Sequence, residues 1–415
     1  MVDNNKLIPL IHKFVKEQAQ KFPPSQPIIK SDPKWAKLLQ TGTQLWLDTG
    51  DIDEASKIWC KEFSALTTNN TLLNKEVQKG IYDSLIKDTA DILTKTFGKM
   101  SSQDLLLEIG FVLNAVHGMR LARSFMCHVS VELHTDLADD IDKTIYYAER
   151  YFLINPDLFY IKVPLTPAGY LSARKLRQKN IPVNFTLGFS ARQNYVAALL
   201  SNPSFVNVFM GRINATVIDN KIGNGKNVGE KVTAATQREL IALRKQEASN
   251  SLLIGASMRD SSQLTSLAGM DVFTIPPKVA SEYHEKPLPT VIENRIPIDP
   301  MVELGTELAV FTTLWTVTTT FKDCVNKLLL KNLDNISTDE LIAHFESAGF
   351  KDFLPEWDNN SIKTIMSDGK IPVYERWKNE LRSGKIGLDA LLNKAGLLAF
   401  TADQKALDDR IKSLL

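Results

Sequence analysis

The sequence predicts an α/β fold, a (β/α)8 TIM barrel, and two observations lead to it. Eight short runs of strand-forming residues occur between residues 44 and 277 of this 415-residue chain. Most neighbouring runs are separated by stretches with helical periodicity, as strand, helix, strand crossover units require. The runs also fill close to the ~250 residues usual for such a barrel. An open doubly wound sheet is the alternative, but no GxGxxG follows the first run.

The elements follow in order along the chain. Residues 1–43 should form an N-terminal helical extension, because apolar side chains recur at helical spacing from Leu7 to Val15. Residues 44–300 should form the barrel, and residues 301–415 a C-terminal helical region packed on it. Helices are expected over stretches such as 167–180 and 191–202. The expected strands are residues 44–50, 63–69, 127–133, 160–166, 183–190, 205–213, 252–258 and 271–277.

Composition limits the cellular compartment and the classes of partner that we expect for this protein. The chain has 49 basic and 48 acidic side chains, a balance that gives no reason to expect nucleic acid or an anionic membrane as partner. Three distant cysteines, Cys60, Cys127 and Cys324, suit a reducing compartment and argue against disulfides and a zinc site. We find no signal peptide and no apolar run near the ~18 residues of a membrane span. The nearest, residues 307–321, is expected to be a buried helix, so the predicted setting is the cytoplasm.

Alternation within the strands places a lysine among carboxylates. In residues 183–190, apolar side chains occupy one face, and Asn184 and Thr186 occupy the other. By the same parity the side chains of Asp48, Glu132 and Lys162 should point into the barrel, while the apolar face lies under the outer helices. In the seventh strand this rule turns Gly255 and Ser257 inward and Ile254 and Ala256 outward.

The inward lysine admits two interpretations. Lys162 could pair with Glu132 or Asp48 in a purely structural ion pair, although burying such charges costs several kcal/mol per ion unless the geometry is good. Alternatively, an amine shielded from water is partly neutral and can attack a carbonyl to form a Schiff base. Nearby carboxylates would then transfer protons as general acids and bases.

Basic residues at two strand ends indicate an anionic group on the substrate. Arg212 closes the expected sixth strand, and Ser257 and Arg259 close the seventh. Two guanidinium groups and a hydroxyl at a barrel rim suit a phosphate. Either arginine alone is equally typical of a solvated surface, but together with the inward lysine they favour a sugar-phosphate carbonyl substrate.

Ordered motifs resemble those of the transaldolase family. LDTGDIDE (47–54) resembles its first strand, LTTNNTLL (66–73) its TTNPSLL motif and HVSVEL (128–133) its VSTEV motif. The stretch 161–193 is similar to the signature in which a strand lysine precedes N-x-T-L-x-F-S. NVFMGRI (207–213) is similar to SPFVGRI, and residues 253–277 resemble the ASFRN segment. The stretch 397–414 resembles the family's closing helix.

The resemblance implies a role for each matching residue. Lys162 matches the Schiff-base lysine, and Asp48 the aspartate that takes the proton from the C4 hydroxyl. Glu132 and Thr186 match the pair that holds a water for proton transfer. The residues implied in substrate binding are Asn69 and Asn184 for the dihydroxyacetone unit, Asn207 and Phe209 on the sixth strand, and Arg212, Ser257 and Arg259 for phosphate. The implied partners are sugar phosphates, no metal or organic cofactor is needed, and a homodimer is compatible.

Departures from the family pattern keep alternatives open. Asn207 and Val208 stand where the family has serine and proline, and Asn207 would donate to the C1 hydroxyl with a longer reach. Phe209 has no hydroxyl, as in the transferases; the fructose 6-phosphate aldolase branch, which has a polar group there, is the runner-up. A non-catalytic sugar-phosphate-binding barrel is a further alternative. Residues 220–231 do not fit a P-loop and are expected to form a surface loop.

Overall fold

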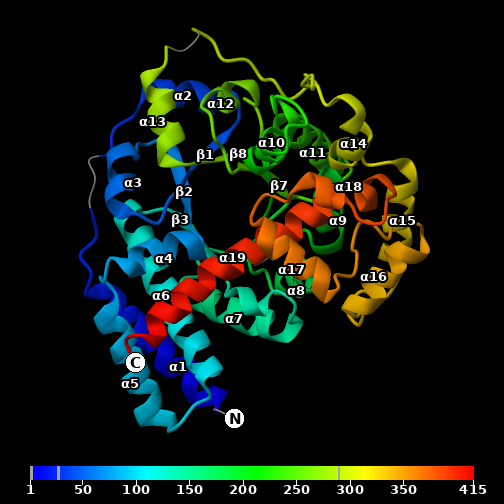
Figure 1. The fold of residues 1–415 in the computed structure, drawn as a ribbon. Coiled ribbons are helices and arrows are strands. Elements are labelled where there is room, and N and C mark those ends of the chain that lie inside the picture. Colours follow the sequence, from blue (N-terminus) through cyan, green and yellow to red (C-terminus); the bar gives the residue numbers. More distant parts are fainter. Residues whose placement is uncertain (1–2, 26–28, 288–289) are drawn as a thin grey trace.

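A computed structural model describes residues 3–25, 29–287 and 290–415. Eight parallel strands close into a barrel in the order β1 to β8 (Figure 1), which confirms the predicted fold. Several expected strands extend too far at their C-terminal ends: the run 205–213 stops at Phe209, where a helix begins. The strands are β1 (Gln44–Asp48), β2 (Phe63–Thr67), β3 (His128–Glu132), β4 (Phe159–Pro164), β5 (Val183–Thr186), β6 (Phe205–Phe209), β7 (Leu252–Ala256) and β8 (Val272–Ile275).

Helices connect the strands and surround the barrel. Many begin with a side-chain cap: Thr166 accepts a hydrogen bond from Gly169, and Ser190 accepts one from Gln193. The helices up to β8 are α1 (Asn4–Gln20), α2 (Pro33–Leu39), α3 (Ile52–Ile58), α4 (Asn70–Gln78), α5 (Asp83–Phe97), α6 (Ser102–Phe125), η1 (Thr135–Leu137), α7 (Ile141–Ile154), α8 (Pro167–Gln178), α9 (Ala191–Ser201), α10 (Met210–Asp219), α11 (Val228–Lys245) and α12 (Ser262–Ser266). Because α11 begins at Val228, the loop expected over 220–231 is shorter than predicted.

The C-terminal helices pack against the outside of the barrel and across its mouth. α14 contacts α9 and α11, and α16 contacts α8. The long helix α19 crosses the open end of the barrel (Figure 1) and contacts α4 and α6 on the far side. These helices are α13 (Pro277–Glu285), η2 (Gly305–Glu307), α14 (Leu308–Trp315), α15 (Thr319–Leu329), α16 (Thr338–Ser347), α17 (Asn359–Asp368), α18 (Tyr374–Arg382) and α19 (Leu388–Lys412). The boundaries at residues 43 and 300 stay a prediction.

The expectation of one buried helix over residues 307–321 was wrong. The segment divides into α14 and α15, because the backbone of Thr316 is extended and Thr318 caps α15 by accepting from Phe321. The helix most like a membrane span is instead α6, which is long and apolar enough and is mostly buried inside the protein. Its Gly118 lies where a Cβ would come within 2.7 Å of Val131, so glycine permits this close packing against β3.

Strand parity separates two apolar layers. Predicted outward residues, such as Leu47, Val131 and Val163, lie in the large core between the strands and helices. A small cluster fills the barrel interior, consisting of Trp46, Ala65, Phe205, Ile254, Ala256 and Val272. The inward direction predicted for Gly255 was therefore wrong. A Cβ on Gly255 would meet Met210 and Met270, so this glycine faces the outer layer, and Ile254 and Ala256 face the interior.

Candidate active site

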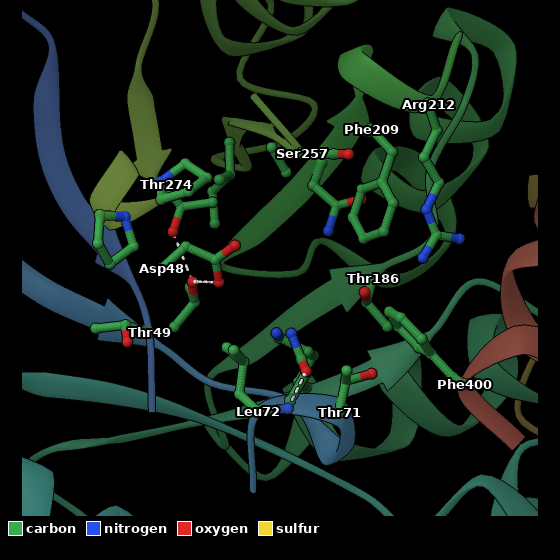
Figure 2. Close-up of a pocket in the computed structure, with 18 of the residues that line it drawn as sticks. Asp48, Thr49, Thr71, Leu72, Thr186, Phe209, Arg212, Ser257, Thr274 and Phe400 are labelled. Atoms are coloured by element: carbon green, nitrogen blue, oxygen red, sulfur yellow. Dashed lines mark hydrogen bonds between the residues drawn. The ribbon is translucent and has the colours of Figure 1, made fainter. Parts of the chain in front are cut away.

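A cavity of about 420 Å³ opens at the C-terminal ends of the strands, above the inner apolar cluster. All the predicted site residues except Glu132 line it: Asp48, Asn69, Lys162, Asn184, Thr186, Asn207, Phe209, Arg212, Ser257 and Arg259. Figure 2 shows Asp48 across the cavity from Arg212 and Phe209. Asp48, with Lys162 beside it, therefore lies at one end of the cavity and Arg212 at the other.

Lys162 lies on β4 with only 6% of its surface exposed. Its Nζ donates a hydrogen bond to the backbone carbonyl of Thr68, 2.6 Å away. The strand register pairs Lys162 with Glu132 on β3 and with Asn184 on β5. Neighbouring strands thus present an amine, a carboxylate and an amide at one level of the barrel.

Asp48 ends β1 beside two hydroxyl groups. The Thr67 hydroxyl donates to its Oδ1 at 2.7 Å, and Thr67 and Thr274 hydroxyls lie 2.6 Å apart, as the dashed lines in Figure 2 show. The position deep in the barrel raises the pKa of Asp48, because burial outweighs the opposing attraction of Lys162. A carboxylate with a raised pKa is a better proton acceptor at neutral pH than an exposed aspartate.

Glu132 lies behind the cavity lining and is 3% exposed. Its Oε2 accepts a hydrogen bond from the backbone N–H of Asn70 at 3.0 Å. Burial raises the pKa of Glu132, and the charge of Lys162 opposes this effect. The carboxyl group is therefore suited to hold or release a proton rather than to remain a fixed charge.

Two polar atoms of β5 at the cavity have no hydrogen-bond partner among the described residues. They are the Thr186 hydroxyl and the side-chain oxygen of Asn184, both on β5 and both buried. The Asn184 Nδ2 donates to the Ser130 hydroxyl at 3.0 Å, which fixes the orientation of the amide. Buried polar groups without partners carry a desolvation cost, so a polar ligand in the cavity would relieve it.

The two remaining asparagines are partly held by the backbone. The Asn69 side chain caps α4 by accepting from Leu72 N at 2.9 Å (Figure 2). In Asn207 the Nδ2 donates to Phe185 O at 2.7 Å and the Oδ1 accepts from Gly188 N at 2.9 Å. One N–H and one acceptor position of the Asn207 amide are left for a ligand, and its donation to a C1 hydroxyl stays a prediction.

Arg212 lies at the basic end of the cavity beside two aromatic rings. Its Cζ is 5.3 Å from the ring centre of Phe209 and 5.2 Å from that of Phe400. Its Nη1 is buried and has no partner in the part of the chain that the structure describes. Burial, with the like charge of Arg259, lowers the pKa of Arg212 to about 10. Two neighbouring guanidinium groups are costly unless an anion joins them, which is the expected electrostatics of a phosphate site.

Ser257 completes the basic end. Its φ of 61° lies in the left-handed region, which interrupts the alternation of β7 as the chain leaves the strand. The Arg259 that follows is exposed at the rim, and its backbone N–H donates to Gln263 at 2.8 Å. In a regular strand, neighbouring side chains point to opposite faces. Because the turn at Ser257 ends this alternation, both Ala256 and Ser257 line the cavity.

Sequence reasoning missed several lining residues. Thr67 and Thr274 orient Asp48, and Phe400 reaches the cavity from α19. The two threonines occupy inward positions of β2 and β8, and the alternation in these two strands would have indicated them. For Phe400 the only signal was the resemblance of residues 397–414 to a closing helix, which marks the segment but not the side chain.

Comparisons with known proteins identify the family of this chain. The sequence model of the family described as Transaldolase/Fructose-6-phosphate aldolase matches residues 45–360. A transaldolase of Xanthomonas euvesicatoria is 29% identical over 261 residues, covering 58% of this chain and 76% of the relative. A transaldolase of Kluyveromyces lactis is 29% identical over 281 residues, with 62% and 78% covered. One of Prochlorococcus marinus is 27% identical over 282 residues, with 63% and 82% covered. The chain thus belongs to the transaldolase/fructose-6-phosphate aldolase family.

Proposed function

We propose that this protein is a transaldolase, a transferase that moves a dihydroxyacetone unit between sugar phosphates. The donor would be sedoheptulose 7-phosphate or fructose 6-phosphate, and the acceptor glyceraldehyde 3-phosphate or erythrose 4-phosphate, in the non-oxidative pentose phosphate pathway of the cytoplasm. The observation that carries the proposal is one cavity that holds the buried amine of Lys162 near Asp48 and, at its other end, Arg212.

The first half of the cycle forms the Schiff base. The neutral amine of Lys162 attacks C2 of the ketose phosphate, and the carbinolamine loses water to give a protonated imine. Glu132 and Thr186 would hold the water through which protons reach and leave this carbinolamine. Their suitability rests on the raised pKa of Glu132 and on the partnerless hydroxyl of Thr186. Asn69 and Asn184 would bind the hydroxyls of the three-carbon unit.

The second half breaks and remakes one carbon–carbon bond. Asp48 takes the proton of the C4 hydroxyl, the C3–C4 bond breaks, and its electron pair moves into the imine, which becomes an enamine. An aldose phosphate leaves while the three-carbon enamine stays on Lys162. The enamine then adds to the aldehyde of a second aldose phosphate, Asp48 returns the proton, and water releases the new ketose phosphate. The protonated imine serves as the electron sink throughout.

Transfer is favoured over simple aldol cleavage by the side chain at position 209. An aldolase must bring water to the enamine, whereas the Phe209 ring lines this cavity and has no group that can orient water. The ring also packs against Phe189 and Phe400. A fructose 6-phosphate aldolase-like activity is therefore the second candidate.

Borohydride trapping tests the proposal directly. The protein is incubated with fructose 6-phosphate, reduced, digested and mapped by mass spectrometry. We expect a three-carbon adduct on the peptide that contains Lys162, and none in the Lys162→Met variant. Lys95→Met is the matched control, since this lysine is exposed on α5. An adduct on another lysine, or none in the unmodified protein, would refute the catalytic role and leave the non-catalytic sugar-phosphate-binding barrel.

The acceptor separates the two activities. With fructose 6-phosphate alone, a transferase should stall as the enamine, and an aldolase should release free dihydroxyacetone continuously. Adding erythrose 4-phosphate should therefore increase turnover by orders of magnitude in the first case only. Comparable release of dihydroxyacetone without an acceptor would assign the chain to the aldolase branch.

A further inference from the structure

One face of α19 covers the basic end of the cavity. Residues Asp389, Asn393, Gly396, Phe400 and Asp403 recur every three or four positions and so lie on one side of the helix. Asn393 Nδ2 donates to the carbonyls of Leu165 and Leu187, at 3.0 and 2.8 Å, where two strands end. Asp403 accepts a hydrogen bond from the Thr71 hydroxyl at 2.5 Å. The helix is thereby attached to the barrel on both sides of Gly396 and Phe400.

Gly396 makes room for the Arg212 guanidinium. A Cβ at this position would lie 2.9 Å from Arg212 Nη1 and 2.8 Å from a methyl carbon of Leu187. Contacts this short do not occur, so a larger residue would displace the Arg212 guanidinium, the Leu187 methyl group or the helix. Since the backbone of Gly396 is an ordinary helical one without positive φ, the glycine is required here by space and not by conformation.

Phe400 lies one helical turn beyond Gly396 and covers the same guanidinium. The Phe400 ring centre lies 5.2 Å from the Arg212 Cζ, close to the 5.3 Å of Phe209, and Figure 2 shows Phe400 projecting from α19. Phe400 itself is 7% exposed. Contact with two rings restricts the side chain and removes water from it, and both effects strengthen its interaction with an anion.

We propose that Gly396 and Phe400 are positioning residues for the phosphate site. The space left by the missing side chain of Gly396 and the ring of Phe400 together hold Arg212 where it meets the phosphate of a sugar phosphate. The inference deepens the proposed function and rests on it. It makes α19 the element that selects phosphorylated over unphosphorylated substrates, because neither residue is required for the chemistry at Lys162. Gly396 acts through Arg212 alone, whereas Phe400 also lines the cavity, so the Gly396 variant is the more direct test.

Two substitutions test the proposal from opposite directions. Gly396→Ala adds one methyl group beside Nη1, and Phe400→Leu removes the ring while keeping an apolar side chain. For both we expect the dissociation constant of inorganic phosphate, measured by calorimetry, to rise about tenfold. The kcat/KM for fructose 6-phosphate should fall by a similar factor, mainly through KM. Borohydride trapping of unphosphorylated dihydroxyacetone on Lys162 should stay within about twofold of the original value.

Stability distinguishes positioning from a structural role. Alanine is a better helix former than glycine, so Gly396→Ala should not lower the melting temperature through the helix itself. Gly110→Ala in α6 is the matched control, since its Cβ would lie at an ordinary 3.7 Å from His134. Phe400→Tyr keeps the ring and should restore phosphate affinity relative to Phe400→Leu.

Two outcomes would overturn the inference. One is unchanged phosphate affinity in both variants, and the other is a parallel loss of phosphate binding and dihydroxyacetone trapping. The two proposals also fail separately. If the unmodified protein forms no imine but Gly396→Ala still weakens phosphate binding, the catalytic proposal is wrong and this inference stands. If the unmodified protein forms the imine but Gly396→Ala and Phe400→Leu leave phosphate binding unchanged, the catalytic proposal stands and this inference is wrong.

Discussion

The buried ion pair that attaches α19 to the barrel should be the most sensitive point of the C-terminal region. Arg192 Nε and Nη2 donate to the two carboxylate oxygens of Asp389 at 2.8 and 2.7 Å, and the Ser190 hydroxyl donates to the same group at 2.6 Å. Asp389 is fully buried and Arg192 is 6% exposed. Burial opposes the charge of Arg192, but Asp389 and then Asp352 outweigh it and raise its pKa.

We predict that Asp389→Ala lowers the free energy of unfolding by about 3 kcal/mol. Removing one partner of a buried pair costs about 3–5 kcal/mol because the other charge is left without compensation. The low end applies because Arg192 keeps Asp352, at 2.8 Å. Urea unfolding, followed by tryptophan fluorescence and far-UV circular dichroism, measures the loss. The double variant Arg192→Met/Asp389→Leu removes both fully buried charges and leaves only Asp352, whose side chain is 18% exposed, without its partner, so it should recover part of the loss.

The matched control is an exposed pair on the same helix. Asp409 and Lys405 lie 3.1 Å apart with more than half of each side chain exposed, so Asp409→Ala should change stability by less than about 1 kcal/mol. The reasoning is refuted if Asp389→Ala costs no more than Asp409→Ala. It is also refuted if the double variant is as unstable as the sum of its single changes.

Two further predictions concern buried titratable groups. Glu132→Gln should abolish most activity yet raise the melting temperature at pH 7. The pKa of Glu132 is raised in the folded protein, so above its ordinary pKa of 4.5 the folded state loses stability because this carboxyl group must ionise or keep its proton against the solvent. The glutamine amide does not ionise and carries no such loss. The gain should shrink as the pH falls toward 4.5, and an equal gain at pH 7 and pH 4.5 would contradict it. His117 is buried beside Tyr82, with a pKa lowered to about 3 by burial and then by Arg120. Below pH 6.5 the unfolded chain protonates His117 and the folded chain does not, so the free energy of unfolding should fall by about 1.4 kcal/mol per pH unit on acidification. In His117→Gln the slope of the unfolding free energy between pH 6 and 4 should be smaller by that amount. An unchanged slope would rule out this contribution of His117.

The barrel and the amine at its centre were predictable because both follow from local rules. Strand alternation turns Lys162 inward whatever its neighbours are, and the strand register then brings Glu132 beside it. The same rule failed in β7, where Ile254 and Ala256 were assigned to the outer face, yet they fill the narrow barrel interior. The residues between them are small, so the two faces of this strand do not differ clearly in polarity. Apolar side chains belong to both layers here, so polarity alone could not assign the face.

Residues that act across long sequence separations could not be predicted. Gly396 and Phe400 meet Arg212 only because α19 folds back over the barrel, and nothing in their own segment specifies that contact. Asn207 illustrates a different limit. A polar side chain on an inward position was expected to serve the ligand, but the structure commits most of its hydrogen bonds to the Phe185 and Gly188 backbone, which only the path of the neighbouring strand determines.

The position of α19 in the chain sets an order of assembly. Residues 44–275, which form the barrel, are synthesised before residues 388–412, which cross its mouth. Because domains fold as their residues emerge, the lysine and its carboxylates are assembled around an uncovered opening before the last helix arrives. Competence for imine chemistry should therefore precede preference for phosphorylated sugars during biosynthesis. A ribosome stalled between residues 300 and 388 would display the first without the second.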